Sequence, residues 1–215
     1  AGFDAIHLDG EHGAFNPVAV DDIVSTAHGY GMSVTARVPN INANEINRWL
    51  DRGLQGIMGP HIENGAEAQA LADACLFPPD GWRSWGGGRG TEHGDMEVLE
   101  GRYGGKLGFA KFANANMLVG GQIESKEAAA RADEILAVPG LAAIAWGPHD
   151  MAASLGHPGE PDHPEVLAIH AEVEAKVRAA GKHLWSDYGT TMDMKVVLIG
   201  QGRAHVAAHK NDAFK

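Results

Sequence analysis

The stretch M-L-V-G-G-Q-I-E-S-K-E-A-A-A-R-A-D-E-I-L-A-V-P-G-L-A-A-I-A-W-G-P-H-D, residues 117–150, has the pattern of a strand, a helix and a second strand. Apolar, β-rich runs at 117–123 and 141–146 flank a helical segment at 126–137. Two parallel strands need a crossover connection, and a helix is the usual one. This stretch therefore predicts a parallel sheet with helices outside it.

The same alternation continues on both sides of this unit. Further strand-like runs lie at 3–8, 34–38, 55–58, 183–186 and 203–208, and further helical patterns lie at 17–29, 44–52, 66–76, 164–180 and 191–199. Seven strands with six helices between them are one βα unit short of a (β/α)8 TIM barrel. We expect a single α/β barrel domain over residues 1–215, with the first strand and last helix of the barrel absent from this sequence. Residues 77–106 have no clear period, and we expect a long loop there that is functional, disordered or at an interface.

Composition narrows the classes of partner. The chain has 17 Lys+Arg and 28 Asp+Glu, which gives a net charge of −11 and argues against nucleic acid as a partner. No apolar run approaches the roughly 20 residues that span a bilayer, so we expect no membrane segment. The single cysteine, Cys75, is typical of a protein from a reducing compartment, and we expect a cytoplasmic location.

Polar and charged side chains follow the ends of successive predicted strands. In chain order these are Asp9, Glu11 and His12, then Arg37, then His61, then Gln122 and Glu124, and finally His149 and Asp150. In a β/α barrel the loops at the carboxyl ends of the strands converge on one face, where active sites are found. The pattern therefore predicts one pocket to which five segments contribute.

Glu124 and Asp150 each end an apolar strand, where an unpaired buried carboxylate is costly. Two carboxylates brought together repel each other unless a proton or a cation lies between them. A set of oxygen ligands suits Mg²⁺ or Mn²⁺ better than zinc. The alternative is structural: Glu124 caps the helix that begins at Lys126, and Asp150 caps a short turn.

Arg37 and His12 are the candidate catalytic side chains. A guanidinium at the end of the second strand suits a carboxylate or an enolate oxygen, although on residue type alone a structural salt bridge, for example to Asp9, is the simpler explanation. An imidazole beside Asp9 and Glu11 can be oriented and kept basic near neutral pH, as a general base requires.

Six motifs resemble, in order and spacing, the HpcH/HpaI aldolase family of metal-dependent class II pyruvate aldolases. They are D-G-E-H (residues 9–12), V-T-A-R-V-P (34–39), R-W-L-D-R-G (48–53), F-P-P-D-G-W-R (77–83), Q-I-E-S (122–125) and G-P-H-D-M-A-A-S-L-G (147–156). The resemblance implies reversible cleavage of a 4-hydroxy-2-oxo acid to pyruvate and an aldehyde in a (β/α)8 barrel. Hexamers built from dimers are common in this family, so we expect a homo-oligomer in which a neighbouring subunit completes the pocket.

The resemblance also implies roles for individual residues. It places a divalent metal, Mg²⁺ or Mn²⁺ before Co²⁺ or Zn²⁺, on Glu124 and Asp150. It assigns the base role to His12, tuned by Asp9 and Asp51, and contact with the keto oxygen to Arg37. The substrate-binding residues are then Arg37, Gln122, Gly147, Pro148 and His149.

Some residues depart from the family pattern. Gly59 replaces the usual apolar residue before the proline of the third strand, and His61 stands where Met is common. We expect such departures to affect the acceptor aldehyde rather than the metal chemistry. Two other functions stay open, an acyl-CoA lyase of the citrate lyase β or malyl-CoA type and a catalytically silent ligand-binding barrel. The net charge of −11 disfavours the first, and the presence of Glu124, Asp150 and Arg37 disfavours the second.

Overall fold

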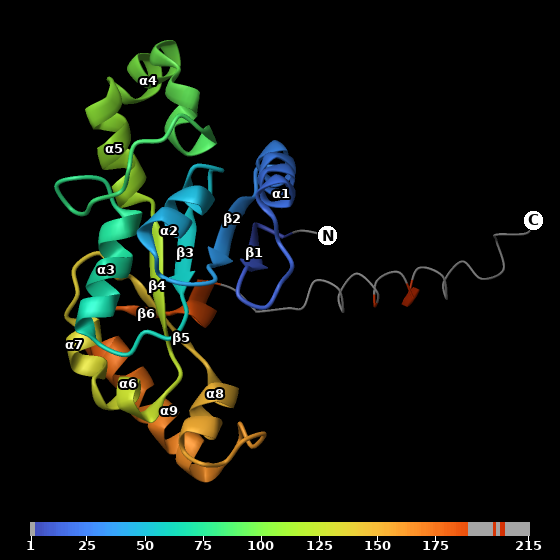
Figure 1. Ribbon diagram of the computed structural model, residues 1–215, viewed down its shortest axis with the longest axis vertical. Coiled ribbons are helices and arrows are strands. Elements are labelled where there is room, and N and C mark those ends of the chain that lie inside the picture. The colour runs from blue at the N-terminus through green and yellow to red at the C-terminus, as the bar shows by residue number, and fades with distance from the viewer. Residues whose placement is uncertain (1–2, 189–199, 201–202, 205–215) are drawn as a thin grey trace, which may run out of the picture. The chain divides into compact units, whose positions relative to one another are not determined.

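The structure is a computed structural model that describes residues 3–188, 200 and 203–204. The chain divides into two compact units, Ala1–Trp185 and Ser186–Lys215. The six strands and the nine α-helices described below lie in the first unit (Figure 1). The expectation of a single domain over residues 1–215 stays a prediction.

The first unit contains six parallel strands in sequential order. They are β1 (Ala5–Asp9), β2 (Ser33–Arg37), β3 (Gly56–Gly59), β4 (Leu118–Ile123), β5 (Ala143–Trp146) and β6 (His183–Leu184). Each strand pairs with the next one along the chain, and helices make most of the crossovers, as Figure 1 shows. This arrangement confirms the predicted α/β barrel architecture over the part of the chain that the structure describes.

Helices cover the sheet and bury its apolar side. They are α1 (Pro17–Gly29), α2 (Ala43–Leu50), α3 (Gly65–Cys75), α4 (Met96–Tyr103), α5 (Lys106–Ala115), α6 (Lys126–Ala130), α7 (Ala132–Leu136), α8 (Pro148–Ser154) and α9 (Pro164–Ala179), with 3-10 turns η1 (Arg89–Gly94) and η2 (Trp185–Tyr188). The main core joins alternate strand residues such as Val34, Ala36 and Ile123 to helix residues such as Leu71 and Val173. Among the described residues, no helix is both long enough and apolar enough to cross a membrane.

Local sequence signals explain where the helices begin. Asn16 accepts a hydrogen bond from the backbone N–H of Ala19, and Pro17 occupies the first turn of α1. The side chain of Asn64 caps α3 through Glu67 N in the same way. These caps satisfy backbone donors that the first helical turn leaves without partners.

Two predicted elements differ from the structure. Arg203 and Ala204 are helical, so the predicted strand at 203–208 is wrong at these two residues. The remaining residues of that strand, and the whole of the predicted helix 191–199, lie outside the described residues. Arg and Ala are strong helix formers, which outweighs the few β-branched residues nearby. The helix predicted at 126–137 is divided at Arg131 into α6 and α7.

The segment 77–106 is more ordered than a loop. It contains η1 and α4, and α5 follows it directly. Phe77, Leu99, Phe109 and Ala110 form a small separate core there. Figure 1 shows α4 and α5 side by side at one end of the first unit. Helices α4 and α5 are thus held together by a small apolar core, although their sequence shows no clear helical period.

Candidate active site

The alternation of side chains along β1 and β2 directs one set of polar groups away from the helices. Val34 and Ala36 are fully buried in the main core, whereas Thr35 and Arg37 point to the opposite face of the sheet. Asp9 pairs directly with Arg37 in the register of β1 and β2. The register alone therefore brings the carboxylate of Asp9 beside the guanidinium of Arg37.

Arg37 joins two carboxylates. Its Nε and Nη2 donate to Oδ1 and Oδ2 of Asp9 at 2.9 and 2.7 Å, and its Nη1 lies 2.8 Å from Oε2 of Glu11. Partial burial acts to raise the pKa of Asp9, but the hydrogen bond and charge of Arg37 lower that pKa below its usual value. The predicted structural alternative for Arg37, a salt bridge to Asp9, is therefore present. Glu11 extends it toward the rest of the site.

Glu124 is the most buried charged side chain of the group, with 2% of its surface exposed. Its Oε1 accepts from the backbone N–H of His61 at 2.8 Å, and its Oε2 accepts from Nε2 of Gln122 at 2.7 Å. Oε1 of Gln122 in turn accepts from Arg37 Nη1 at 3.4 Å. Gln122 thus links the guanidinium of Arg37 to the carboxylate of Glu124.

Ser125, and not Glu124, caps the helix that begins at Lys126. Ser125 accepts the hydrogen bond from Ala128 N at the start of α6. Asp150 lies in the first turn of α8, whose N-cap residue is Gly147 and has no side-chain cap hydrogen bond. The structural explanation for these two carboxylates is therefore not supported by their hydrogen bonds.

The electrostatic setting of Glu124 favours a cation. Burial raises the pKa of Glu124, and the charges of Asp150 and Glu11 raise it further against the opposing effect of His61. Within the described residues, no Lys or Arg forms an ion pair with Glu124. Three carboxylates therefore act on one another here, and Glu124 has no permanently cationic contact.

Gly147 packs directly against the side chain of Glu124. A Cβ at this position would lie 2.5 Å from Oε2 of Glu124 and 2.9 Å from Nε2 of Gln122. Gly147 follows β5 directly, and its N–H donates to the carbonyl of Ile123 at 3.2 Å. The absence of a side chain at Gly147 therefore lets the carboxylate of Glu124 lie at the end of β5, and carboxylate oxygens are the ligands that a small divalent cation prefers.

Two further residues complete the network, and neither was among the predicted catalytic, substrate-binding or metal residues. Nδ1 of His61 lies 3.0 Å from Oε1 of Glu124, and its Nε2 lies 3.1 Å from Oε1 of Glu11. His61 and Glu11 do follow predicted strands, which is the sequence signal that could have identified them. Their partners are up to 63 residues away, so the sequence shows no contact between them.

Other predicted site residues lie less close together. His12 is 70% exposed, and its Nε2 is 3.8 Å from Oε2 of Glu11. Asp51 ends α2 beside the 86–90 segment, where its carbonyl accepts from Gly90 N at 3.1 Å. Pro148 and His149 occupy the first turn of α8, and His149 is exposed. The described contacts therefore join Asp9, Arg37, Gln122 and Glu124, with Asp51 outside the group.

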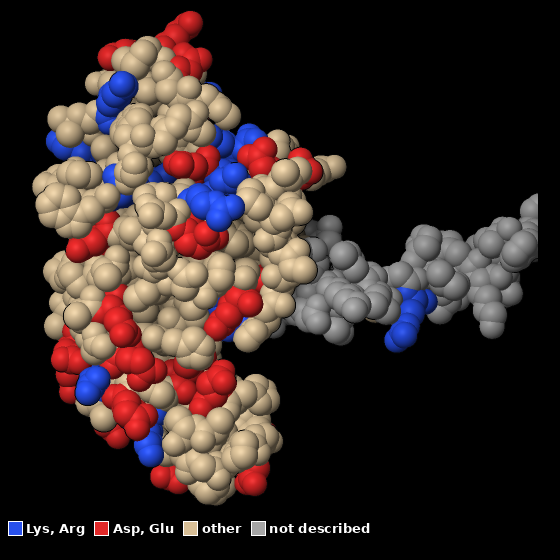
Figure 2. Space-filling model, viewed as in Figure 1, with Lys and Arg blue, Asp and Glu red and all other residues tan. Residues whose placement is uncertain are grey.

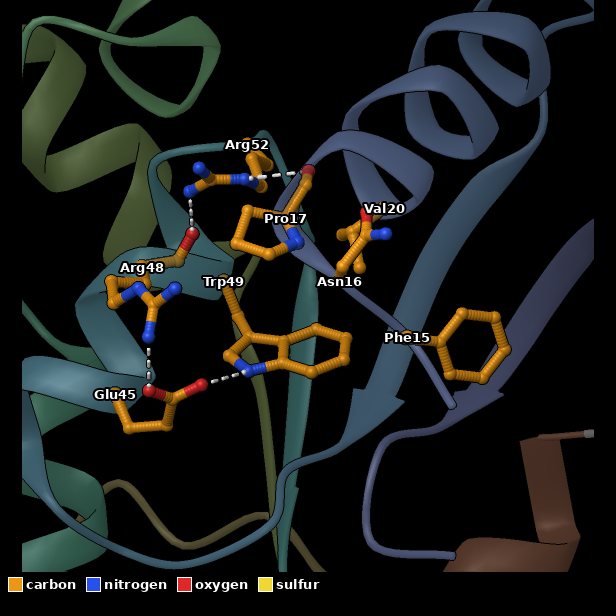
Figure 3. Close-up of a pocket in the computed structure, with 8 residues that line it drawn as sticks. All are labelled: Phe15, Asn16, Pro17, Val20, Glu45, Arg48, Trp49 and Arg52. Carbon is orange, nitrogen blue, oxygen red and sulfur yellow. Dashed lines mark hydrogen bonds and ion pairs between the residues drawn. The ribbon is translucent and has the colours of Figure 1, made fainter. Parts of the chain in front are cut away.

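A separate pocket lies between the start of α1 and α2 (Figure 3). Glu45 contacts both Nη1 of Arg48 at 2.9 Å and Nε1 of Trp49 at 3.0 Å, and Arg52 Nε donates to the carbonyl of Pro17 at 3.0 Å. Figure 2 shows Lys and Arg side chains gathered near the middle of the face drawn there, and Asp and Glu side chains over its lower part. Glu45 and Arg48 are thus paired with each other, Arg52 binds backbone carbonyls, and none of the three contacts the Glu124 network.

A second group of possible metal ligands lies in the turn before α9. One ligand atom from each of His157, Glu160 and His163 lies within 4.8 Å of the others. The two imidazole rings are stacked, with centroids 3.6 Å apart, and Nδ1 of His163 accepts from Glu165 N at 3.3 Å. Stacked rings direct their nitrogens alongside one another rather than toward a common centre, which makes this group the poorer candidate.

Comparison with known proteins identifies the family of this chain. The sequence matches the family described as HpcH/HpaI aldolase/citrate lyase over residues 1–208. Over 183 residues it is 33% identical to a pyruvate aldolase of Rhizobium etli, which covers 85% of this chain and 68% of that protein. It is also 33% identical over 183 residues to a 4-hydroxy-2-oxovalerate aldolase of Rhodococcus jostii, covering 85% and 67%.

A solved structure shows the same fold. An HpcH/HpaI aldolase/citrate lyase family protein from Burkholderia cenocepacia superposes with a TM-score of 0.79 at 26% identity, covering 97% of this chain and 86% of that one. The family match and both aldolase relatives extend over most of the sequence. The chain therefore belongs to the HpcH/HpaI aldolase/citrate lyase family, a family of lyases.

Proposed function

We propose that this chain catalyses the reversible aldol cleavage of a 4-hydroxy-2-oxo acid into pyruvate, or a close 2-oxo acid, and an aldehyde. The relatives that share 33% of its residues are a pyruvate aldolase and a 4-hydroxy-2-oxovalerate aldolase. Such substrates share a keto oxygen that must accept negative charge when the C3–C4 bond breaks. The chemistry therefore needs an electrophilic group at that oxygen and a base for the 4-hydroxyl proton.

The observation that carries the proposal is the buried carboxylate of Glu124 beside Asp150. Glu124 is 2% exposed, and its pKa is raised by burial and, to a smaller extent, by the charges of Asp150 and Glu11, against the opposing effect of His61. Gly147, which has no side chain, lets this carboxylate lie directly against it. We infer that Glu124 and Asp150 hold a divalent cation, Mg²⁺ or Mn²⁺ before Co²⁺ or Zn²⁺. When bound, the cation supplies a Lewis acid that stabilises negative charge on the keto oxygen of the substrate.

The chain's own residues supply the remaining steps. Arg37 faces the same network and adds positive charge near the keto oxygen, while Gln122 keeps Glu124 oriented. His12, exposed at the mouth of the site, takes the 4-hydroxyl proton; the electron pair of the C3–C4 bond moves toward the keto oxygen and the aldehyde leaves. The same imidazolium then returns a proton to C3, which gives pyruvate.

Assembly and location follow the family resemblance. We expect a homo-oligomer, a hexamer or another dimer-based assembly, in the cytoplasm. Asp51 is proposed to act with His12, and because it lies at the end of α2 beside the 86–90 segment, a neighbouring subunit is the natural source of that contact.

Turnover of a 4-hydroxy-2-oxo acid, followed by pyruvate release, tests the proposal. EDTA should abolish activity, and Mg²⁺ or Mn²⁺ should restore it. Glu124→Gln and Asp150→Asn should each lower kcat/KM at least ~10³-fold, because each removes a charged ligand of the cation. Glu45→Gln, which changes a paired carboxylate in the separate pocket of Figure 3, should retain activity and serves as the control.

Two results would contradict the proposal. One is full activity after EDTA treatment or in either carboxylate variant. The other is covalent trapping of pyruvate on the protein by borohydride, because a Schiff base on a lysine would replace the role of the cation.

A further inference from the structure

His61 lies between two carboxylates of the site. Its Nδ1 is 3.0 Å from Oε1 of Glu124, its Nε2 is 3.1 Å from Oε1 of Glu11, and 58% of its side chain is exposed. Neither the proposed reaction nor the predicted cation site uses this imidazole. Its Nδ1 is nevertheless almost as close to Glu124 as Nε2 of Gln122, which lies 2.7 Å from Oε2.

The backbone fixes where this imidazole is. His61 follows β3 by two residues, has φ of +48°, and donates its N–H to Glu124 Oε1 at 2.8 Å. The next residue, Ile62, is fully buried and donates its N–H to the carbonyl of Gln122 at 3.0 Å. A residue other than glycine seldom adopts this left-handed conformation. Here the hydrogen bonds to Glu124 and to the carbonyl of Gln122 hold the backbone in it.

The spacing suits a common cation. Two ligands at right angles, each about 2.1 Å from a divalent ion, are about 3.0 Å apart, which is the separation of His61 Nδ1 and Glu124 Oε1. Without a cation, two lone pairs at that distance repel, so a proton must lie between the nitrogen and the oxygen. A cation can take the place of that proton.

The other ring nitrogen has the partner that a ligating histidine requires. Metal-bound histidines usually donate their second ring N–H to a carboxylate or carbonyl, which fixes the ring orientation. Glu11 occupies that position for His61 Nε2, and Arg37 Nη1 holds Glu11 in turn at 2.8 Å. A line of contacts thus leads to the proposed cation, from Arg37 through Glu11 and His61 to Glu124.

We propose that Nδ1 of His61 is a further protein ligand to the divalent cation that Glu124 holds. This proposal rests on the proposed function, because it needs the cation at that carboxylate. Imidazole binds Mn²⁺, Co²⁺ and Zn²⁺ more readily than Mg²⁺, which favours oxygen and water. His61 therefore shifts the preference of the site from Mg²⁺ toward these softer ions.

Metal binding, measured without substrate, tests the proposal. The protein is stripped with EDTA, dialysed and titrated calorimetrically with Mg²⁺, Mn²⁺, Co²⁺ and Zn²⁺, and the visible spectrum of the Co²⁺ form is recorded. His61→Asn is the test variant, since Asn tolerates a positive φ. Glu124→Gln removes the site itself, and His157→Gln is the matched control, a histidine that also contacts a carboxylate, that of Glu165 at 3.3 Å.

We expect His61→Asn to weaken Co²⁺ and Zn²⁺ binding at least ~10-fold, to leave Mg²⁺ binding within a factor of three, and to change the Co²⁺ spectrum. Equal weakening of all four ions, or an unchanged spectrum, would overturn the role of His61 while Glu124→Gln still abolishes binding. If Glu124→Gln binds normally, or if His157→Gln removes binding, the cation lies elsewhere and the proposed function fails with it.

Discussion

Arg37 shows how much of the site depends on one side chain. It makes a two-bond contact with Asp9, contacts Glu11, and reaches Gln122 at 3.4 Å. Burial acts to lower the pKa of Arg37, but its hydrogen bond to Asp9 and the charges of Asp9, Glu11 and Glu124 raise that pKa above its usual value. The guanidinium therefore stays charged at any pH at which the enzyme works.

Arg37→Lys keeps the charge and removes the planar group. A lysine ammonium cannot make the paired bonds to Asp9 while also holding Glu11, so we expect kcat/KM to fall about 10²-fold with little loss of folded protein. Steady-state kinetics and circular dichroism measure the two effects. Arg48→Lys is the matched control, because Arg48 pairs with Glu45 at 2.9 Å outside the network. Equal activity in the two variants would rule out a role for the Arg37 guanidinium.

At the residue scale, the sequence identified most of the side chains of the site but not the contacts between them. Strand alternation and strand ends indicated Asp9, Arg37, Gln122 and Glu124, which the structure joins. The sequence could not choose between a salt bridge and a substrate contact for Arg37, because that choice depends on the register of β1 and β2. His61 was noticed as a departure from the family, and its contacts with two carboxylates needed the geometry of the loop after β3.

At the scale of elements, strong and repeated patterns were predicted well. The unit β4, α6–α7 and β5 lies where the pattern of residues 117–150 placed it, and six of the seven predicted strands pair in one parallel sheet. Weak patterns failed: α4 has few apolar residues, and only Leu99 among them is buried. Its stability comes from packing on α5, a tertiary effect that local periodicity does not contain.

Helix α3 offers a prediction for pH dependence. Its last residue, Cys75, is 1% exposed, and burial raises the pKa of its thiol from 9.0 to about 12. The unfolded chain therefore loses this proton at lower pH than the folded chain does. The stability that the protonated thiol contributes to the folded state is therefore fully present below pH 9. Between about pH 9 and 12 the free energy of unfolding should fall by up to ~1.4 kcal/mol per pH unit.

Urea unfolding at pH 8, 9, 10 and 11 measures this effect. Cys75→Ala is expected to be less stable at pH 8 because it leaves a small cavity, and to lose stability more slowly as the pH rises. Arg83 interacts electrostatically with this thiol, so the difference in slope reports the thiol together with its coupling to Arg83. Identical slopes for the two proteins would show that Cys75 does not titrate differently on unfolding.

At the scale of the whole molecule, the parallel order of β1 to β5 places the end of each strand at one side of the sheet. Asp9 ends β1, Arg37 ends β2, and Glu124 follows β4, so residues more than 100 positions apart form one network. The fold thus explains why the polar residues of the sequence recur just after its apolar runs.

The position of the cation is the central claim, and anomalous diffraction from crystals soaked in Mn²⁺ and pyruvate tests it most directly. We predict an anomalous peak bonded to carboxylate oxygens of Glu124 and Asp150, with pyruvate beside it. A peak at His157 and His163 alone, or pyruvate bound next to Glu124 with no ion, would contradict the account.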